Sequence, residues 1–344
     1  MKASRVWLGL FLMAFGVLFA NLMVTLSTQP AHGDMTRIAK ISEREFGWRS
    51  TPPPIAMADI VNAPIQDADV LIIGDSYSMF FAWQSVLVKA GYRVATTHWD
   101  NIDAICDDFG PWLRRSGFAG KLVLFESVER VMPQRISNAQ ACKAMRRPFT
   151  AVPIPPSSPS AAAPDFKVNW NGTVFSGLEV WRNTQRIRYM GKNDVVFNVP
   201  RYGDSVFAAN VPDGCAQFSN RMCEHGLFLM HDRQFRELTI DDAEFLAQIR
   251  DRAAPTKMLW MVIPNKTSVY LDAEHAKQFE RRANELAIGP DLFSMARVAR
   301  REVVDLYWPN DTHWSMQGQL YFGQQMLKVV QSAIGAPNRN ARAS

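Results

Sequence analysis

The chain has 344 residues, a length that accommodates one large domain or a domain with an insertion. Its content of 47% hydrophobic and 21% charged residues is typical of a globular protein and excludes wholesale disorder. The net charge of +5 comes without a dense basic block or an aromatic-basic platform, which argues against nucleic-acid binding. An acidic polysaccharide or a membrane surface is compatible with this charge.

The N-terminus carries Lys2 and Arg5 ahead of an apolar run over 6–26. Crossing a bilayer takes about 20 apolar residues, whereas the core of a signal peptide has about 7–15. Positive residues before the run predict a cytoplasmic N-terminus and an exported remainder. We therefore predict a single-pass signal anchor over 1–26 in the inner membrane, with the rest in the periplasm. Ala31-His32-Gly33 offers a cleavage site, so release into the periplasm after signal cleavage is the alternative.

Residues 27–64 are polar and rich in proline, which predicts a spacer between the membrane and the first domain. The run over 70–73 is apolar and β-branched, as expected for a strand buried on both faces of a parallel sheet. A predicted helix and two further predicted strands follow, over 79–90, 93–97 and 121–126. This alternation predicts an α/β fold, with a parallel sheet flanked by helices, whose first part spans 65–150.

The alternation of predicted strands and helices stops at residue 151. Residues 151–164 are of low complexity, and short alternating runs separated by turn signals continue to about 230. We therefore predict a linker and a β-rich insertion over 151–230. The alternation resumes in a second part over 231–338, followed by a tail over 339–344. Its predicted elements are a helix over 241–254, a strand over 257–264, a helix over 273–286, a strand over 303–306 and a helix over 316–334.

Four cysteines are compatible with an oxidising compartment, where disulfides persist. Three pairings are possible. The short separations favour Cys106–Cys142 and Cys215–Cys223, with free buried thiols as the alternative. Because no C-x-x-C motif occurs, neither a zinc site nor a thioredoxin-like site is expected.

Ser76 is the candidate nucleophile, because Gly74-Asp75-Ser76 follows the apolar strand directly and a predicted helix comes next. Ligands of open α/β sheets bind at the carboxyl ends of the strands. The backbone N–H of Ser76, at a helix N-terminus, would face a developing oxyanion. His313 precedes the last predicted helix and is the candidate general base. Asp311 can accept a hydrogen bond from its Nδ1–H, which completes a predicted catalytic triad.

Other residues that carry similar chemistry have structural explanations. A second Gly-Asp-Ser, over 203–205, lies inside the predicted β-rich insertion and is interpreted as a turn. His98 lies close to the predicted site but has no evident acidic partner. The remaining histidines show no metal-ligand spacing, so neither a metal nor another cofactor is expected.

The chain resembles the SGNH hydrolase-like superfamily, whose signature residues are Ser, Gly, Asn and His. It is most similar to the alginate O-acetyltransferase-like branch, which O-acetylates bacterial exopolysaccharides. The resemblance rests on Gly74-Asp75-Ser76-Tyr77-Ser78, on Glu126-x-x-x-Arg130, on Ile263-Pro264-x-Lys266-x-x-Val269-Tyr270, and on Asp311-Thr312-His313-Trp314 with Gly318. In that branch the Asp-x-His-Trp block precedes the serine block, whereas here it follows. The acceptor polysaccharide is therefore not carried over with the triad.

The resemblance implies a three-layer, flavodoxin-like sheet and several residues that bind substrate or stabilise the oxyanion. These residues are Tyr77, Asn101, Glu126, Arg130, Lys266 and Trp314. Asn101 is a candidate by position alone, since no clear Gly-x-Asn-Asp block is present. Glu126 and Arg130 would face together if their segment is helical, and an ion pair that supports the site is an equal alternative. Lys266 has the same two interpretations.

These observations predict a periplasmic, membrane-anchored O-acetyltransferase that passes acetyl through Ser76 to hydroxyls of an exopolysaccharide or cell-envelope glycan. Because acetyl-CoA is not expected outside the cytoplasm, the resemblance implies a membrane-bound O-acyltransferase partner as the acetyl donor. With water as acceptor, the same triad would make the protein a carbohydrate esterase or deacetylase. A non-catalytic glycan-binding or assembly protein is a further alternative.

Overall fold

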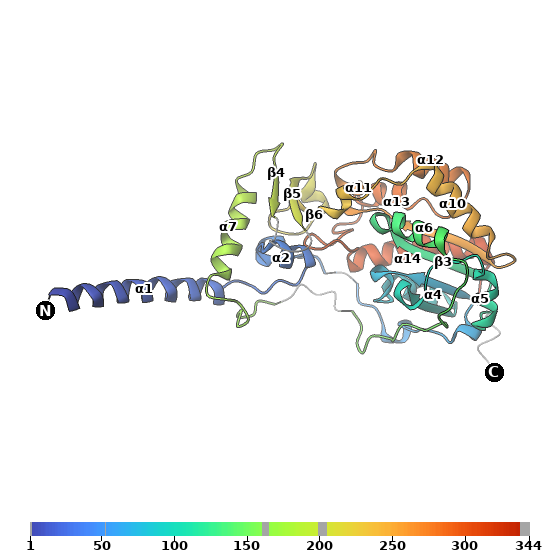
Figure 1. Ribbon diagram of the computed structural model, residues 1–344, viewed down its shortest axis with the longest axis horizontal. Coiled ribbons are helices and arrows are strands. Elements are labelled where there is room, and N and C mark those ends of the chain that lie inside the picture. The colour runs from blue at the N-terminus through green and yellow to red at the C-terminus, as the bar shows by residue number, and fades with distance from the viewer. Residues whose placement is uncertain (1, 52, 160–164, 199–204, 338–344) are drawn as a thin grey trace. The chain divides into compact units, whose positions relative to one another are not determined.

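The computed structural model of the chain describes residues 2–51, 53–159, 165–198 and 205–337 (Figure 1). The chain divides into two compact units, which are described separately. Unit 1 comprises Met1–Ser50, Ala162–His231 and Tyr307–Thr312. Unit 2 comprises Thr51–Ala161, Asp232–Leu306 and His313–Ser344.

Unit 2 is built around a four-stranded parallel sheet in the order β2-β1-β3-β7, which confirms the predicted α/β class. The strands are β1 (Val70–Gly74), β2 (Val94–His98), β3 (Leu122–Val128) and β7 (Lys257–Ile263). Every residue of β1 and β3 is buried, which explains why the runs over 70–73 and 122–125 are apolar without alternation. Gly74 pairs in register with His98 on the neighbouring strand, so the carboxyl ends of β1 and β2 meet at one edge.

Helices cover both faces of this sheet (Figure 1). Helices α4 (Ala82–Ala90) and α14 (Met316–Ile334) pack on each other. Helices α5 (Phe109–Arg115), α6 (Met132–Ala141) and α10 (Ile240–Asp251) contribute to the core with inward side chains of β1 and β3, such as Leu71 and Phe125. The remaining helices of unit 2 are α11 (Lys266–Tyr270), α12 (Lys277–Glu285) and α13 (Leu292–Ala299). Short 3₁₀ turns are η1 (Met57–Asp59), η2 (Ile65–Asp67), η3 (Ser76–Ser78), η4 (Trp99–Asn101) and η5 (Glu129–Val131).

The strand predicted over 303–306 is not formed. Helix α13 ends at Ala299, and the Val303 N–H donates to the Ala299 carbonyl, so the chain continues in turns. Asp305 adopts a positive φ of 55°, which interrupts an extended conformation. The Leu306 carbonyl accepts the Ser315 N–H just before α14. The backbone groups of this segment therefore form local hydrogen bonds instead of pairing with a neighbouring strand.

Unit 1 contains a three-stranded antiparallel sheet in the order β4-β5-β6. Its strands are β4 (Val195–Asn198), β5 (Val206–Asn210) and β6 (His225–Leu229). Its helices are α1 (Lys2–Leu26), α2 (Asp34–Ala39), α3 (Glu43–Phe46), α7 (Ser176–Arg188) and α8 (Gly214–Gln217). Helix α9 (His231–Gln234) lies at the boundary between the two units in the sequence. The long helix α7 was not predicted. One of the alternating runs in the predicted β-rich insertion, over 167–170, is not a strand, because Asn169 donates its N–H to the Leu26 carbonyl at 3.2 Å rather than to a strand partner.

Residues 27–64, which were predicted to be a spacer, contain two short helices. Helices α2 and α3 bury Met35 and Phe46, which pack with Val206 and Leu227 of the antiparallel sheet. Part of 27–64 therefore belongs to the core of unit 1. Polar and proline residues around these apolar side chains concealed the two short helices in the sequence.

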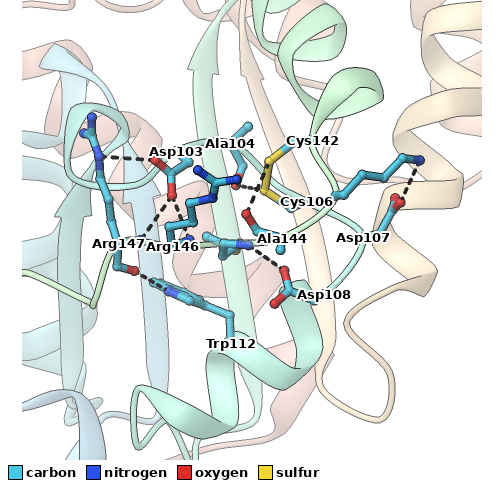
Figure 2. Close-up of a disulfide and its surroundings, with 12 residues drawn as sticks. Asp103, Ala104, Cys106, Asp107, Asp108, Trp112, Cys142, Ala144, Arg146 and Arg147 are labelled. Atoms are coloured by element: carbon cyan, nitrogen blue, oxygen red, sulfur yellow. Dashed lines mark hydrogen bonds and ion pairs between the residues drawn. A yellow bond between two sulfur atoms is a disulfide. The ribbon is translucent and has the colours of Figure 1, made fainter.

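The N-terminal helix α1 is long and apolar enough to cross a membrane, a property that an N-terminal signal sequence shares. Both favoured cysteine pairings are confirmed, with Cys106–Cys142 in unit 2 and Cys215–Cys223 in unit 1. Figure 2 shows the first disulfide joining the end of α6 to the segment before α5. Beside it, Asp103 accepts the N–H groups of Arg146 and Arg147, and Trp112 donates to the Arg147 carbonyl at 2.8 Å.

Candidate functional site

Ser76 and His313 lie within hydrogen-bonding distance although 237 residues separate them in sequence. The Ser76 Oγ is 2.7 Å from the Nε2 of His313, and both side chains are half-buried. Ser76 opens the turn η3 immediately after β1, and the Asp75 carboxylate caps that turn by accepting the Tyr77 N–H at 3.2 Å. His313 stands just before α14, and its ring packs against Tyr77 with centroids 4.9 Å apart.

Asp311 belongs to the segment Tyr307–Thr312, which is part of unit 1. Its Oδ2 accepts the backbone N–H of Asp34 at 2.9 Å, a contact within that unit. The pairing of Asp311 with the His313 ring therefore stays a prediction. Within either unit taken by itself, the described residues hold no group of three His, Cys, Asp or Glu side chains close enough to bind a metal ion.

A buried carboxyl group lies directly behind the serine turn. The Oε2 of Glu126 accepts the Asp75 N–H and the Ser78 hydroxyl, each at 2.8 Å. Burial raises the pKa of Glu126 well above its ordinary value, and the nearby Asp75 carboxylate adds to the rise. A Cβ at Gly74 would lie 2.7 Å from this Oε2, so only glycine lets the carboxyl group approach the end of β1. Glu126 thus shapes the turn that presents Ser76.

The predicted helical pairing of Glu126 with Arg130 is wrong, because Glu126 lies on β3 and Arg130 in the turn η5. Arg130 instead hydrogen-bonds to the side chain of Tyr77 and lies 3.6 Å from the Asp232 carboxylate. Burial raises the pKa of Asp232, while the Arg130 charge opposes that rise. Arg130 therefore links the residue after Ser76 to a buried acid from a distant part of the chain.

Arg135 and Trp99 belong to the same surroundings and were not predicted. The Arg135 Nη2 is 3.4 Å from Asp75 Oδ2, and its guanidinium lies over the Trp99 ring at 4.1 Å from the centroid. Trp99 in turn donates its indole N–H to the Glu126 carbonyl at 2.7 Å. Burial lowers the pKa of Arg135 to about 10. The sequence offered no local signal for this contact, because Trp99 and Arg135 follow different strands.

Two residues assigned to substrate binding are buried in the fold. Lys266 is the first residue of α11 and is 1% exposed, with its charge close to Asp232. Trp314 is also 1% exposed, stacks on Phe322 at 4.0 Å and meets the Tyr77 ring edge-on. Neither side chain is accessible to a sugar in this structure. Burial favours the structural interpretation of Lys266 and a packing role for Trp314, and substrate contact by either side chain stays a prediction.

Asn101 lies in the turn η4 after β2, where its side-chain amide donates to the Thr150 carbonyl at 3.3 Å. Its second contact is the Thr97 hydroxyl at 3.5 Å. Both contacts hold the segment around Thr150 against β2. The Asn101 side-chain amide therefore hydrogen-bonds to these neighbouring residues rather than to the Ser76 hydroxyl.

A cavity of about 670 Å³ opens beside these residues at the carboxyl ends of β2 and β3. Three arginines, Arg130, Arg135 and Arg147, line it together with Trp99 and the carboxyl groups of Asp100 and Asp103. Within the described part of the chain, the buried Nη1 atoms of Arg130 and Arg135 have no hydrogen-bond partner. A second cavity of about 700 Å³ lies around the start of β7, at the opposite end of the strands from Ser76.

Comparison with protein-family models, with curated proteins and with solved structures found no match.

Proposed function

We propose that this protein is a serine-dependent O-acetyltransferase of the SGNH hydrolase-like superfamily, acting in the periplasm on a bacterial exopolysaccharide or cell-envelope glycan. The observation that carries the proposal is the 2.7 Å separation of Ser76 Oγ and His313 Nε2 at the carboxyl end of β1. A serine becomes a nucleophile when a base within hydrogen-bonding distance takes its proton. Ser76 and His313 are both half-exposed at the end of a strand, which a purely structural Ser–His contact does not require.

In the first half-reaction, Ser76 Oγ attacks the carbonyl carbon of a donor acetyl ester while His313 Nε2 accepts the serine proton. The bond between that carbon and the donor oxygen then breaks, and the leaving oxygen takes the proton from His313. In the second half-reaction a sugar hydroxyl gives its proton to His313 and attacks the acetyl-serine. The serine ester bond breaks, and Ser76 regains the proton. Asp311 is proposed to hold Nδ1–H of the imidazole throughout.

The cavity beside the site supports a glycan acceptor. Its arginine side chains offer hydrogen-bond donors, including the buried Nη1 atoms of Arg130 and Arg135, and such donors match the hydroxyl groups of a sugar. Arg130 connects this cavity to the turn of Ser76 through Tyr77.

Membrane attachment through α1 and two disulfides support a periplasmic location facing the inner membrane. Acetyl must then reach Ser76 from the cytoplasm, and we propose a membrane-bound O-acyltransferase as the partner that delivers it. A cleaved signal peptide and a soluble periplasmic form are the alternative for this part of the proposal.

The transfer reaction is tested with the purified chain, an activated acetyl ester and a panel of neutral and acidic oligosaccharides. We expect acetylated sugar to form faster than free acetate, and Ser76→Ala to abolish both products. Release of acetate without acetylated sugar across the panel would establish the esterase alternative instead. Full activity in Ser76→Ala would leave the glycan-binding alternative.

A further inference from the structure

The end of helix α1 is embedded in the fold of unit 1. Thr25 is 0% exposed, and its hydroxyl donates to the carbonyls of Thr173 and Val174 and accepts the Gly177 N–H at 3.0 Å. A Cβ on Gly177 would lie 2.6 Å from the Thr25 Cα, so this close approach requires glycine. The last turn of α1 is therefore docked on the start of α7.

A group of exposed apolar side chains surrounds this docking point, on α7 and the segment before it. We call it the α7 apolar surface; it comprises Phe166, Trp170, Phe175, Leu178, Trp181 and Tyr189. Trp170 is 77% and Trp181 57% exposed. Contiguous exposed apolar surface on a folded protein marks a contact with a partner or a membrane. Isolated exposed apolar residues are ordinary, but these six lie within 24 residues of chain.

The composition and direction of α7 match those of a helix that lies in a membrane interface. Leu178, Trp181 and Tyr189 recur at a helical spacing on its exposed side, whereas Asn183 and Ile187 face the core. Exposed Arg182 and Arg186 accompany them, and interfacial helices combine such basic residues with tryptophan and leucine. Figure 1 shows α7 running crosswise to α1, so a helix along the membrane normal places α7 along the membrane plane.

We propose that the α7 apolar surface inserts into the outer interfacial layer of the phospholipid bilayer that α1 crosses. The occupant of this surface is lipid, because Thr25 docks the start of α7 on the end of α1, whose apolar side chains are exposed from Val6 to Val24. Tryptophan and tyrosine concentrate at the depth of lipid headgroups. Unit 1 then has two membrane contacts, one spanning and one interfacial. This inference rests on the proposed anchoring through α1 and is independent of the catalytic proposal.

The test uses the full chain reconstituted in vesicles of phosphatidylethanolamine and phosphatidylglycerol that contain a phospholipid with a diazirine near the headgroup. After irradiation, lipid adducts are mapped by mass spectrometry of peptides. We expect adducts on α1 and on peptides covering 166–189. Adducts on α1 without any on 166–189 would overturn the inference, leave the anchor intact and indicate a protein partner for this surface. Adducts on neither segment would refute the anchor together with the inference.

Variants test which side chains make the contact. The double variant Trp170→Ser/Trp181→Ser should lower labelling of 166–189 several-fold while α1 labelling stays constant. Phe80→Ser removes a similarly exposed aromatic side chain from unit 2 and should leave both unchanged. Gly177→Val should also lower labelling of 166–189, because its side chain displaces Thr25, whereas Gly9→Val meets no neighbouring atom and is the matched control. Unchanged labelling of 166–189 in both the double variant and Gly177→Val would contradict the proposed contact.

Discussion

The tripeptide Gly-Asp-Ser occurs twice, and its two serines lie in different surroundings. Ser76 opens the turn that follows the buried parallel strand β1, and its hydroxyl lies 2.7 Å from the His313 imidazole. Ser205 lies just before β5, and its carbonyl accepts the Met230 N–H at 2.8 Å. Gly203 and Asp204 lie outside the described residues. The Ser205 backbone thus extends the pairing of an antiparallel sheet.

The two serines differ because different side chains surround each of them. At Ser76, the strand ends, and side chains from β3, α6 and the start of α14 gather around the turn. At Ser205 the strand is only beginning. The same three residue types therefore acquire a candidate base only where parallel strands end together.

The largest effect that distinguishes the two serines is expected on catalysis. Ser76→Ala and His313→Ala should each lower turnover of an activated acetyl ester by about 10⁶-fold, and the double variant by little more, because triad residues act as a unit. Asp311→Asn should cost about 10⁴-fold, since the imidazole remains but in the wrong tautomer. The measurement is steady-state kinetics with folding checked by circular dichroism. Additive losses in the double variant would refute a shared mechanism.

A smaller effect is expected from the glycine that lets Glu126 reach the Ser76 turn. Gly74→Ala places a Cβ 2.5 Å from Ser78 Oγ and 2.7 Å from Glu126 Oε2. Overpacking of this kind lowers the free energy of unfolding by about 1–3 kcal/mol. The denaturant midpoint of the detergent-solubilised chain measures it. Gly9→Ala, where no atom lies near the added methyl group, should not destabilise the protein, and equal midpoints for the two variants would argue against the tight approach.

The buried acids near the Ser76 turn also predict a pH dependence. Burial raises the pKa of Glu129 to about 7, where it accepts bonds from Asn265 N–H and the Ser268 hydroxyl and faces His275 at 3.3 Å. A raised carboxyl pKa favours the folded state at low pH. Its contribution, on the order of 3 kcal/mol, is lost as pH rises from about 4.5 through about 7. Glu129→Gln resembles the protonated form and should flatten the unfolding free energy over this window. An unchanged slope would indicate that another group titrates.

The smallest effect is expected at the second serine. Ser205→Ala leaves the backbone carbonyl that pairs with Met230 in place, so the unfolding free energy should change by less than about 0.5 kcal/mol. Esterase and transferase rates should equal those of the wild type. A large loss of activity in this variant would reverse the assignment of the two Gly-Asp-Ser stretches.

Several features were determined by the sequence itself because they depend on neighbouring residues. Strand β1 and the parts of β3 and β7 over 122–125 and 258–263 are apolar runs, and their burial in a parallel sheet follows from that pattern. Helix α14 spans Met316–Ile334 as predicted, since Ser315 caps its start and Gly335 its end. The disulfide pairings followed from short separations. The candidate nucleophile Ser76 was recognisable from the strand that precedes it.

Other features were decided only by tertiary structure, because they join segments that are distant in the chain. The proximity of Ser76 and His313 required the end of β1 and the segment before α14 to meet, and the sequence predicted the residues but not the distance. The sequence predicted Glu126 at the end of a strand, whereas pairing of β3 with β7 extends that strand to Val128, and the Glu126 carboxyl group accepts the Asp75 N–H. Packing of α2 and α3 on a sheet more than 150 residues away is likewise invisible to local periodicity. Local patterns set backbone conformation, whereas side-chain neighbours depend on which distant elements share a core.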